Sequence, residues 1–265
     1  MDLGLHGTVV LITGGSKGIG LACARGFMAE GARVAIASRN AEHLAQAAAA
    51  LRDEGGEGAE PFTVAADLGD SRQAADMVRA VEAALGPIGV LVNSAGAARR
   101  TPPAELTAAD WHAAMDAKYF TYIHAIDAVL PGMARRGGGA IVNVVGIGGK
   151  LASPTHLPGG AANAALMLAS AGLANAFAGK GVRVNAVNPG LTATERMQQG
   201  FEAEARLAGR TVQEIVDQRL RALPLGRVAQ PGDVADVVVF LASKRAGYVS
   251  GAVLSVDGAV TPMVV

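Results

Sequence analysis

Cysteine, aromatic residues and net charge are all scarce in this chain of 265 residues. A single cysteine, Cys23, excludes a disulfide-stapled scaffold and a metal site built from several thiolates. Basic and acidic residues both number 23, so the composition gives no general electrostatic footprint for nucleic acid or an anionic membrane. The first apolar run, 8–13, has no basic segment or cleavage site before it. We therefore infer no signal peptide and expect a cytoplasmic protein.

Small and aliphatic residues take the place of the missing aromatics. Hydrophobic residues make up 51% of the chain, which is enough to bury a large core and excludes a disordered protein. Glycine accounts for 35 of the 265 residues, well above the usual share of about 7%. Because these glycines follow no Gly-x-y period, collagen is also excluded. The composition indicates a globular core in which backbone segments approach closely.

One segment, 151–179, contains no aspartate, glutamate, lysine or arginine and is long enough to span a bilayer. Two prolines, a histidine, two asparagines and several glycines interrupt it, and its alanine-rich composition is poor for insertion. We therefore expect a buried helix over about 160–178 and no membrane partner.

Short β-branched runs alternate with helical stretches along the chain. Strands are expected at 8–13, 33–38, 61–66, 90–93, 140–145, 183–187 and 252–256. Helices are expected from the first glycines to about residue 30 and at 41–54, 71–85, 108–136, 160–178 and 234–242, with a flexible turn at 55–58. This alternation predicts an α/β fold: one doubly wound Rossmann-type domain over 1–265, with a parallel sheet and helices on both faces. The polar segment 192–222 is the expected mobile lid over a substrate.

The first strand runs directly into a glycine-rich segment where the first helix starts. Glycines at this point allow the backbone to turn and to approach a pyrophosphate, whose charge then lies at the helix N-terminus. A tight glycine turn without a ligand is the alternative. The residues expected to hold a dinucleotide here are Gly14, Ser16, Lys17, Gly18, Ile19 and Gly20.

The end of the second strand indicates which dinucleotide binds. An acidic residue there binds a ribose 2′-hydroxyl, whereas an arginine accepts a 2′-phosphate. The strand ends in Ser38 and Arg39, without a carboxylate. Arg39 and Lys17 therefore predict a 2′-phosphate clamp and a preference for NADP(H) over NAD(H), unless both are ordinary solvated charges. Asp67, which precedes Leu68 after the third strand, can accept a hydrogen bond from the adenine amino group or cap the next helix.

Several of these segments resemble the short-chain dehydrogenase/reductase family over nearly the whole chain. The segment from Thr13 to Gly20 fits its T-G-x-x-x-G-x-G pattern, and 93–96 fits its N-N-A-G pattern with one asparagine replaced by serine. Asn188-Pro189-Gly190 followed by Thr192 resembles its P-G-x-x-x-T region beside the nicotinamide carboxamide. The resemblance implies a dimer or tetramer formed through the helices at 108–136 and 160–178. It also implies cofactor contacts from Asn93, Ala95, Gly96, Pro189, Gly190 and Thr192.

The catalytic side chains of that family are absent from the positions that the resemblance assigns to them. The family normally uses a serine, a tyrosine, a lysine four residues after the tyrosine, and an asparagine in the long central helix. Here these positions fall on Gly146, Gly159, Asn163 and Lys118, respectively. None of the three tyrosines has a lysine four residues later. The chain is thus identified as a divergent member of the family.

Carbonyl reduction needs a proton as well as a hydride, and three residues are candidates to supply it. Lys118 would lie deep in the site, where burial lowers the pKa of an amine and allows proton donation or Schiff-base formation; a solvent-directed or ion-paired lysine is the alternative. His156, on the loop that faces the substrate in this family, is a competent acid near neutral pH, or else an ordinary loop histidine. Tyr122 lies one turn beyond Lys118 on the same helical face.

Three functional hypotheses follow. The first is an NADP(H)-dependent oxidoreductase of a small carbonyl or alcohol substrate, with Lys118 or His156 handling the proton. The second is a sensor or partner subunit that binds NADP(H) without catalysis. The third is a lyase-type site with Lys118 as nucleophile. Arg99, Arg100 and Lys150 flank the expected cleft, where they attract an anionic substrate or form a solvated rim; neither a metal nor a nucleic-acid partner is expected.

Overall fold

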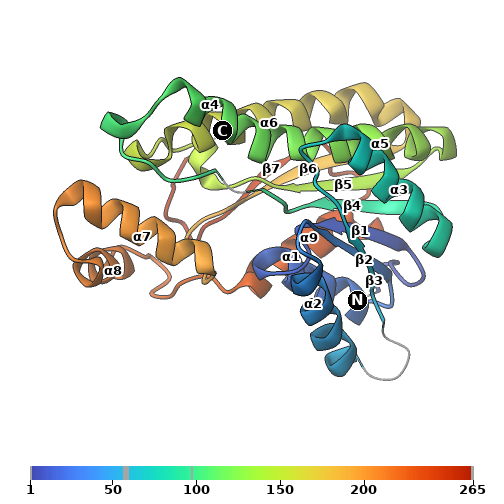
Figure 1. Ribbon diagram of the computed structural model, residues 1–265. Coiled ribbons are helices and arrows are strands. Elements are labelled where there is room, and N and C mark those ends of the chain that lie inside the picture. The colour runs from blue at the N-terminus through green and yellow to red at the C-terminus, as the bar shows by residue number, and fades with distance from the viewer. Residues whose placement is uncertain (1, 56–59, 97, 264–265) are drawn as a thin grey trace.

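Seven parallel strands form one sheet in the order β3-β2-β1-β4-β5-β6-β7 (Figure 1). The computed structural model describes residues 2–55, 60–96 and 98–263. The strands are β1 (Val9–Thr13), β2 (Arg33–Ser38), β3 (Phe62–Ala65), β4 (Ile88–Asn93), β5 (Gly139–Val144), β6 (Val182–Pro189) and β7 (Val253–Val256). The predicted parallel sheet and its strand positions are confirmed. The strand order reverses between β1 and β4, which is where ligands bind in open α/β sheets.

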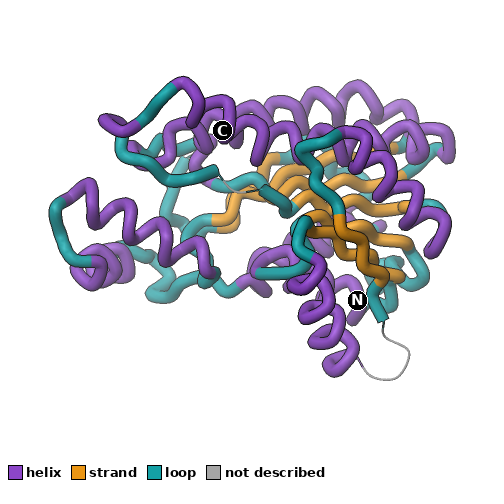
Figure 2. The backbone as a smooth tube through the Cα atoms, viewed as in Figure 1, coloured by secondary structure: helices purple, strands orange, loops and turns teal. Residues whose placement is uncertain are grey.

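Helices cover both faces of the sheet, as predicted (Figure 2). One layer consists of α1 (Gly18–Ala29), α2 (Ala41–Gly55) and α9 (Pro231–Ala242). The other consists of α3 (Ser71–Leu85), α4 (Ala108–Ala114), α5 (Thr121–Arg136) and α6 (Leu157–Phe177). Residues 56–58 of the predicted turn lie outside the described residues.

The hydrophobic core forms two layers, one on each face of the sheet, and alternate residues of a strand contribute to each layer. Val10 and Ile12 of β1 pack with Phe27 of α1, whereas Val9 and Leu11 pack with the helices of the opposite layer. Because both faces are covered, the strand is buried along its full length and its sequence is continuously apolar rather than alternating.

The uncharged segment forms α6, but the helix is not buried as expected. The helical stretch Pro154–Lys180 is long and apolar enough to cross a membrane, with a mean hydropathy of 1.3. Only 28% of its most apolar 18-residue window is buried. One side of α6 packs on β6 through residues such as Leu166 and Ala174, while Leu168 on the other side is 77% exposed. The expectation of a buried helix therefore holds for one side only, and α6 has an open apolar face on the other.

The helix predicted over 108–136 is continuous but contains a π-helical turn, Met115–Phe120, between α4 and α5. A π turn leaves backbone groups without their usual helical partners. Here the hydroxyl of Thr121 donates to the carbonyl oxygens of Ala117 and Lys118, at 3.3 and 3.0 Å. The turn lies at the edge of the sheet where β4 ends, because the Gly96 loop packs directly on Ala117.

Helices α7 (Glu195–Ala208) and α8 (Val212–Arg221) extend beyond the sheet (Figure 1). They have a small hydrophobic cluster of their own, in which Phe201 and Ala205 of α7 pack against Ile215 of α8. Thr211 caps α8, and Glu214 completes the capping box. This pair of helices is therefore a packed unit in the region predicted as a lid.

Candidate active site

The loop between β1 and α1 forms a cradle that only glycine backbones can build. Gly14 adopts a φ of +67°, and a Cβ there would lie 2.7 Å from the carbonyl oxygen of Ser94. A Cβ on Gly20 would lie 2.8 Å from the carbonyl carbon of Gly14. The backbone amide of Gly14 donates to the carbonyl of Ala37 at 2.8 Å, so the loop is anchored to β2. This shape at the N-terminus of α1 fits a pyrophosphate.

A buried chain of polar side chains ties the carboxyl ends of β1, β4 and β5 together. Thr13 donates to Asn93 at 3.1 Å, Asn93 to Asn143 at 3.0 Å, and Asn143 to Ser170 of α6 at 2.9 Å. Thr13, Asn93 and Asn143 are neighbours in strand register. The Thr13 hydroxyl oxygen also accepts from the backbone amide of Ala95 at 3.4 Å. Asn93 is thus engaged internally, and it positions the loops around a ligand rather than facing one.

The structure places the two predicted 2′-phosphate ligands in different surroundings. Lys17 forms an exposed ion pair with Glu195 of α7 at 3.3 Å. Arg39 is exposed immediately after β2, and no hydrogen bond joins it to Lys17 in the described part of the chain. The hydroxyl oxygen of Ser38 accepts a long hydrogen bond from the backbone amide of Asn40, at 3.5 Å. Lys17 therefore connects the phosphate loop with the helix pair beyond the sheet.

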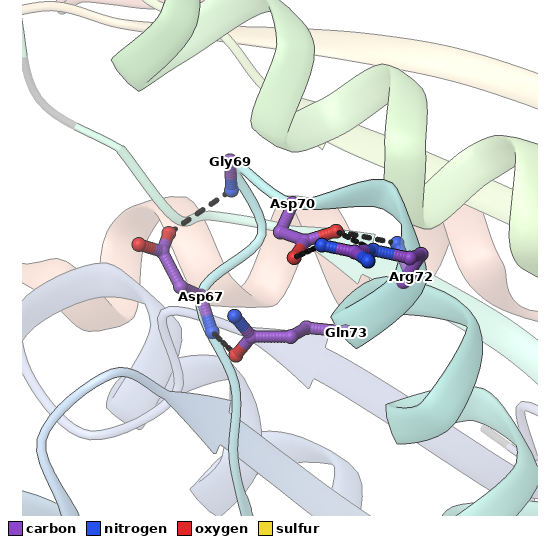
Figure 3. Close-up of polar contacts among 5 residues, drawn as sticks. All are labelled: Asp67, Gly69, Asp70, Arg72 and Gln73. Atoms are coloured by element: carbon purple, nitrogen blue, oxygen red, sulfur yellow. Dashed lines mark hydrogen bonds and ion pairs between the residues drawn. The ribbon is translucent and has the colours of Figure 1, made fainter.

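Asp67 does not cap the helix that follows it (Figure 3). Its carboxylate accepts from the backbone amide of Gly69 at 3.0 Å, whereas Asp70 is the N-cap of α3 and accepts from the amide of Arg72 at 2.8 Å. The side chain of Leu68 is buried. The helix-cap alternative for Asp67 is thus wrong, and its carboxylate is exposed beside the loop.

The segment after β6 brings a residue to the phosphate loop that the sequence analysis missed. Thr192 is buried, and its hydroxyl donates back to the carbonyl of Gly190 at 3.2 Å. Thr194 instead faces the loop, with its methyl group 3.3 Å from where a Cβ on Gly18 would stand. The P-G-x-x-x-T spacing counted from Pro189 ends at Thr194, so the signal was present in the sequence.

The positions of the family's serine and lysine face each other. Gly146 has a φ of +124°, which side-chain-bearing residues rarely adopt. A Cβ on Gly146 would lie 3.2 Å from the amide nitrogen of the Asn163 side chain. Asn163 is 5% exposed. The buried amide thus lies close to the space that a residue-146 side chain would need.

The imidazole of His156 fills the space next to Gly159, the position that the family resemblance assigns to the tyrosine. A Cβ built on Gly159 would lie 2.7 Å from each ring nitrogen of His156. The Nδ1 atom of His156 is buried and has no hydrogen-bond partner within the described residues. Burial, followed by the charges of Arg100, Arg196 and Lys118, lowers the pKa of His156 to about 4. The ring therefore lies beside the position that the sequence analysis assigned to the family's tyrosine, and it is neutral at pH 7.

Lys118 points inward from the π turn. Its Nζ donates to the hydroxyl oxygen of Tyr122 at 2.7 Å and to the carbonyl oxygen of Val144 at 3.0 Å. The residue is 6% exposed, and burial, followed by the charge of Arg196, lowers its pKa well below the usual value. Burial of Tyr122 raises the pKa of its phenol, which donates to Val144 at 2.6 Å. Neither the solvent-directed nor the ion-paired alternative for Lys118 holds.

Two arginines complete the surroundings of His156. The guanidinium of Arg196 in α7 donates to the carbonyl oxygen of Gly96 at 3.1 Å. The residue as a whole is exposed, but protein atoms around the guanidinium desolvate it and lower the pKa of Arg196. Arg100 lies against α7, with its Nε 3.1 Å from where a Cβ on Gly200 would stand. Desolvation also lowers the pKa of Arg100. Arg196 gave no signal in the sequence, because only the fold brings α7 to this site.

The other two basic residues predicted at the cleft do not join this group. Lys150 donates to the backbone carbonyl of Val253 in β7 at 3.3 Å. Arg99 is exposed on the loop before Arg100. Of the three residues, the structure thus assigns only Arg100 to the surroundings of His156.

Known proteins match this chain over nearly its whole length. Residues 14–261 match the family model described as enoyl-(acyl carrier protein) reductase. Gluconate 5-dehydrogenase from Gluconobacter oxydans (strain 621H) is 34% identical over 257 residues, which cover 97% of this chain and 96% of that protein.

Two solved structures show the same fold. L-Sorbose reductase from Gluconobacter frateurii, complexed with NADPH and L-sorbose, has a TM-score of 0.88 at 31% identity and covers 97% of this chain and 98% of its own. An NADPH-bound short-chain oxidoreductase from Pseudomonas aeruginosa PAO1 with an atypical catalytic centre has a TM-score of 0.86 at 34% identity, with the same coverage. On its sequence, sheet order and nucleotide cradle, the chain belongs to the short-chain dehydrogenase/reductase family of oxidoreductases.

Proposed function

We propose that this protein is an NADP(H)-dependent oxidoreductase of a small carbonyl or alcohol substrate, with a non-standard group that handles the proton. The observation that carries the proposal is the ring of His156, which occupies the space above Gly159 and keeps a buried nitrogen without a partner. The NADPH bound in both structural relatives supports the choice of cofactor, and the atypical centre of one supports a departure from the usual residues.

The residues of the cradle fit a dinucleotide. Gly14, Gly18 and Gly20 leave room for a pyrophosphate at the start of α1, and Thr194 borders the same loop. Arg39, exposed after β2, is suited to a 2′-phosphate. The bound cofactor gives or takes the hydride, while the protein orients the reactants and moves the proton.

His156 is suited to act first as a base. Because its pKa is about 4, the imidazole is neutral at pH 7 and can accept the proton of an alcohol during oxidation, but it is a weak base until a bound negative charge raises that pKa. Lys118 lies in the same site, and burial lowers the pKa of its amine, which favours the neutral form and makes the amine a second candidate to exchange a proton. Tyr122 and Val144 hold that amine in place, and Tyr122 is thus a positioning residue.

The lyase alternative has less support. The Nζ of Lys118 is enclosed by two hydrogen-bond acceptors, and the residue is 6% exposed, so a carbonyl carbon has no open approach to it. No specific feature of the structure favours a sensor without catalysis, since buried groups with shifted pKa values cluster at functional sites.

We also propose that the segment 192–222 closes over the substrate as a lid. Its two helices have their own hydrophobic cluster, so they can move as a unit. Lys17 and Glu195 join this unit to the phosphate loop by an exposed ion pair, which contributes little to stability and breaks easily.

The catalytic proposal is tested by following absorbance at 340 nm during reduction of a carbonyl panel and oxidation of the matching alcohols. We expect turnover that falls at least 100-fold in His156→Gln and is unchanged in His43→Gln, a histidine of α2 on the opposite side of the sheet. No substrate-dependent change in NADPH or NADP⁺ across the panel would leave the sensor hypothesis in its place.

The cofactor proposal is tested by calorimetric titration with NADPH and NADH in parallel. Replacing Arg39 by Gln removes charge-assisted hydrogen bonds to a 2′-phosphate, which are worth about 1.5–3 kcal/mol. We expect NADPH affinity to fall about 10- to 100-fold and NADH affinity to stay within twofold. Tighter binding of NADH than NADPH by the wild-type protein would refute the preference.

A further inference from the structure

Three basic side chains from three separate parts of the chain lie near His156: the amide of Thr101, next to Arg100, donates to the carbonyl of Thr155 at 3.0 Å, and α7 packs against the turn 154–156. Lys118 comes from the π turn, Arg100 from the loop after β4, and Arg196 from the lid helix α7. Arg100 and Arg196 act on the His156 imidazole as positive charges, whereas burial lowers the pKa of Lys118 and so favours its uncharged amine. The helix that starts at His156 adds no charge, because 151–179 contains no ionisable residue other than His156 itself.

The two arginines have no matching carboxylate in the described structure. Neither takes part in an ion pair between residues 2–55, 60–96 and 98–263. Glu204 is the acidic residue whose charge Arg100 senses, but its carboxylate is already held by the Nε and Nη2 atoms of Arg219. The positive charge around His156 is therefore not neutralised from within the fold.

Desolvated cations that lack a partner destabilise a protein, unless a bound anion compensates them. The guanidinium group of Arg presents a planar fork of donors that matches a carboxylate. One N–H group of Arg196 donates to the carbonyl oxygen of Gly96, and Arg100 makes no hydrogen bond within the described residues. Both guanidinium groups therefore have N–H donors available for a ligand. The buried, unpartnered Nδ1 of His156 is a further polar group with no role inside the fold.

From this geometry we propose that the substrate carries a carboxylate, which Arg100 and Arg196 bind beside His156. The assignment names the substrate class of the proposed oxidoreductase and therefore rests on that proposal. A negative charge next to His156 favours the imidazolium form. Binding of the acid substrate thus increases the fraction of His156 that is protonated, and an uncharged substrate gives no such increase.

The reduction then balances with groups already named. The carbonyl carbon receives the hydride of bound NADPH, and the carbonyl oxygen receives the proton of the His156 imidazolium. A hydroxy acid, NADP⁺ and a neutral imidazole result. Alcohol oxidation runs the same transfers in reverse, with neutral His156 taking the hydroxyl proton.

The anion site is tested without turnover by measuring the pKa of His156 by NMR of histidine labelled at ring carbon ε1. His156→Gln assigns the resonance, and propionate is the probe. We expect propionate to raise the pKa of His156 by about one unit or more, which equals a tenfold preference for the protonated form. Propionamide, its uncharged match, and sodium chloride at equal ionic strength are expected to leave the pKa in place.

Variants identify the residues responsible. In Arg100→Gln and Arg196→Gln we expect the pKa of His156 without propionate to rise. We expect propionate to shift that pKa by less than roughly 0.3 unit, compared with the shift of about one unit in the wild type. Arg99→Gln is the matched control, an exposed neighbour on the same loop that is expected to behave as wild type. A propionate effect that survives both arginine replacements would overturn the proposal. Loss of the propionate effect once NADP⁺ is bound would also overturn the proposal, because the cofactor phosphates would then be the anion that this site binds. A shift of the His156 pKa produced equally by inorganic phosphate would overturn it as well.

A kinetic comparison separates this inference from the proposed function. For an oxo acid and its methyl ester, we expect the acid to be preferred at least tenfold in kcat/KM, with the preference lost in Arg196→Gln and kept in Arg99→Gln. Turnover with equal rates for acid and ester would refute the carboxylate site and leave the oxidoreductase intact. If propionate shifts the pKa of His156 but the protein turns over no substrate, the carboxylate site is kept and the oxidoreductase proposal is refuted.

Discussion

The amine of Lys118 donates a hydrogen bond of 2.7 Å to the phenol oxygen of Tyr122, one turn further along the same helix. Both groups also donate to the carbonyl oxygen of Val144 at the end of β5. In the aligned family this position is an asparagine, whose role is polar but uncharged. The chain has thus placed an ionisable amine in a fully enclosed polar unit at the base of its site.

Replacing Lys118 by Met is expected to remove one contribution to the dependence of stability on alkaline pH. The unfolded lysine has a pKa of about 10.4, and burial lowers it in the fold. Between the two values the unfolded chain binds more protons at this group, so the contribution of Lys118 to stability rises as pH increases toward about 10. We expect Lys118→Met to lose that rise. The buried Cys23 and Tyr122, whose pKa values are raised in the fold, still lower the stability of both proteins as pH approaches 10. At pH 7 we expect the variant to match the wild type or exceed it by about 1 kcal/mol.

Tyr122→Phe is the control variant, since it removes one hydrogen-bond acceptor of the Lys118 amine and leaves the carbonyl of Val144. Its stability is expected to keep the contribution of Lys118 that rises at alkaline pH. A Lys118→Met protein that is less stable than wild type by more than about 2 kcal/mol at pH 7 would show that the amine contributes to folding, contrary to the usual cost of a buried charge.

His156 is expected to make the protein sensitive to acid. Its pKa is about 4 in the fold and about 6.5 in the unfolded chain. The unfolded state therefore binds more protons below pH 6.5, and stability is lost as pH falls from about 6.5 to 4. We expect the loss between pH 7 and pH 4 to be smaller in His156→Gln than in wild type by about 2–3 kcal/mol. Urea denaturation at several pH values measures it; equal slopes in both proteins would contradict the buried neutral imidazole.

Restoring the family's tyrosine alone is expected to harm the fold. A Cβ on residue 159 lies 2.7 Å from both ring nitrogens of His156, so Gly159→Tyr requires the imidazole to move. Overpacking of this kind costs about 1–3 kcal/mol. We expect the double variant His156→Ala, Gly159→Tyr to recover most of that loss. A double-mutant cycle of melting temperatures shows the coupling, and additive effects would mean that the two side chains occupy different space.

The open face of α6 is expected to bind a second copy of the chain, as the family resemblance implies. Leu168 is 77% exposed there, and Trp111 and Phe120 on the neighbouring helix are 42% and 40% exposed. We expect light scattering to show a dimer or tetramer and Leu168→Glu to raise its dissociation constant at least 100-fold, because a charge would be buried without a partner. Leu225→Glu, 67% exposed elsewhere, is the control. A wild-type monomer at micromolar concentration would refute the interface.

The elements themselves were predictable because their signals are local. The buried strands carry continuous apolar runs, and the glycine cradle follows from backbone shape at Gly14 and Gly20. The Asp67 alternative was settled only by the structure, since Asp67 and Asp70 are both suitable caps by residue type and only Asp70 meets the helix amides. Which side of α6 is exposed was also decided only by the structure, because a segment without charges looks the same whether protein or a partner covers it.

The sequence by itself determined that this chain has a nucleotide-binding α/β fold, and it predicted glycine, glycine and asparagine at the positions of the family's serine, tyrosine and lysine. The tertiary structure decided what replaces them. The π turn directs Lys118 inward, the loop before α6 lays His156 over Gly159, and α7 brings Arg196 to a site 40 and 78 residues away in the chain. Desolvation and charge act through space, so the shifted pKa values of this site exist only once the fold has brought these groups together.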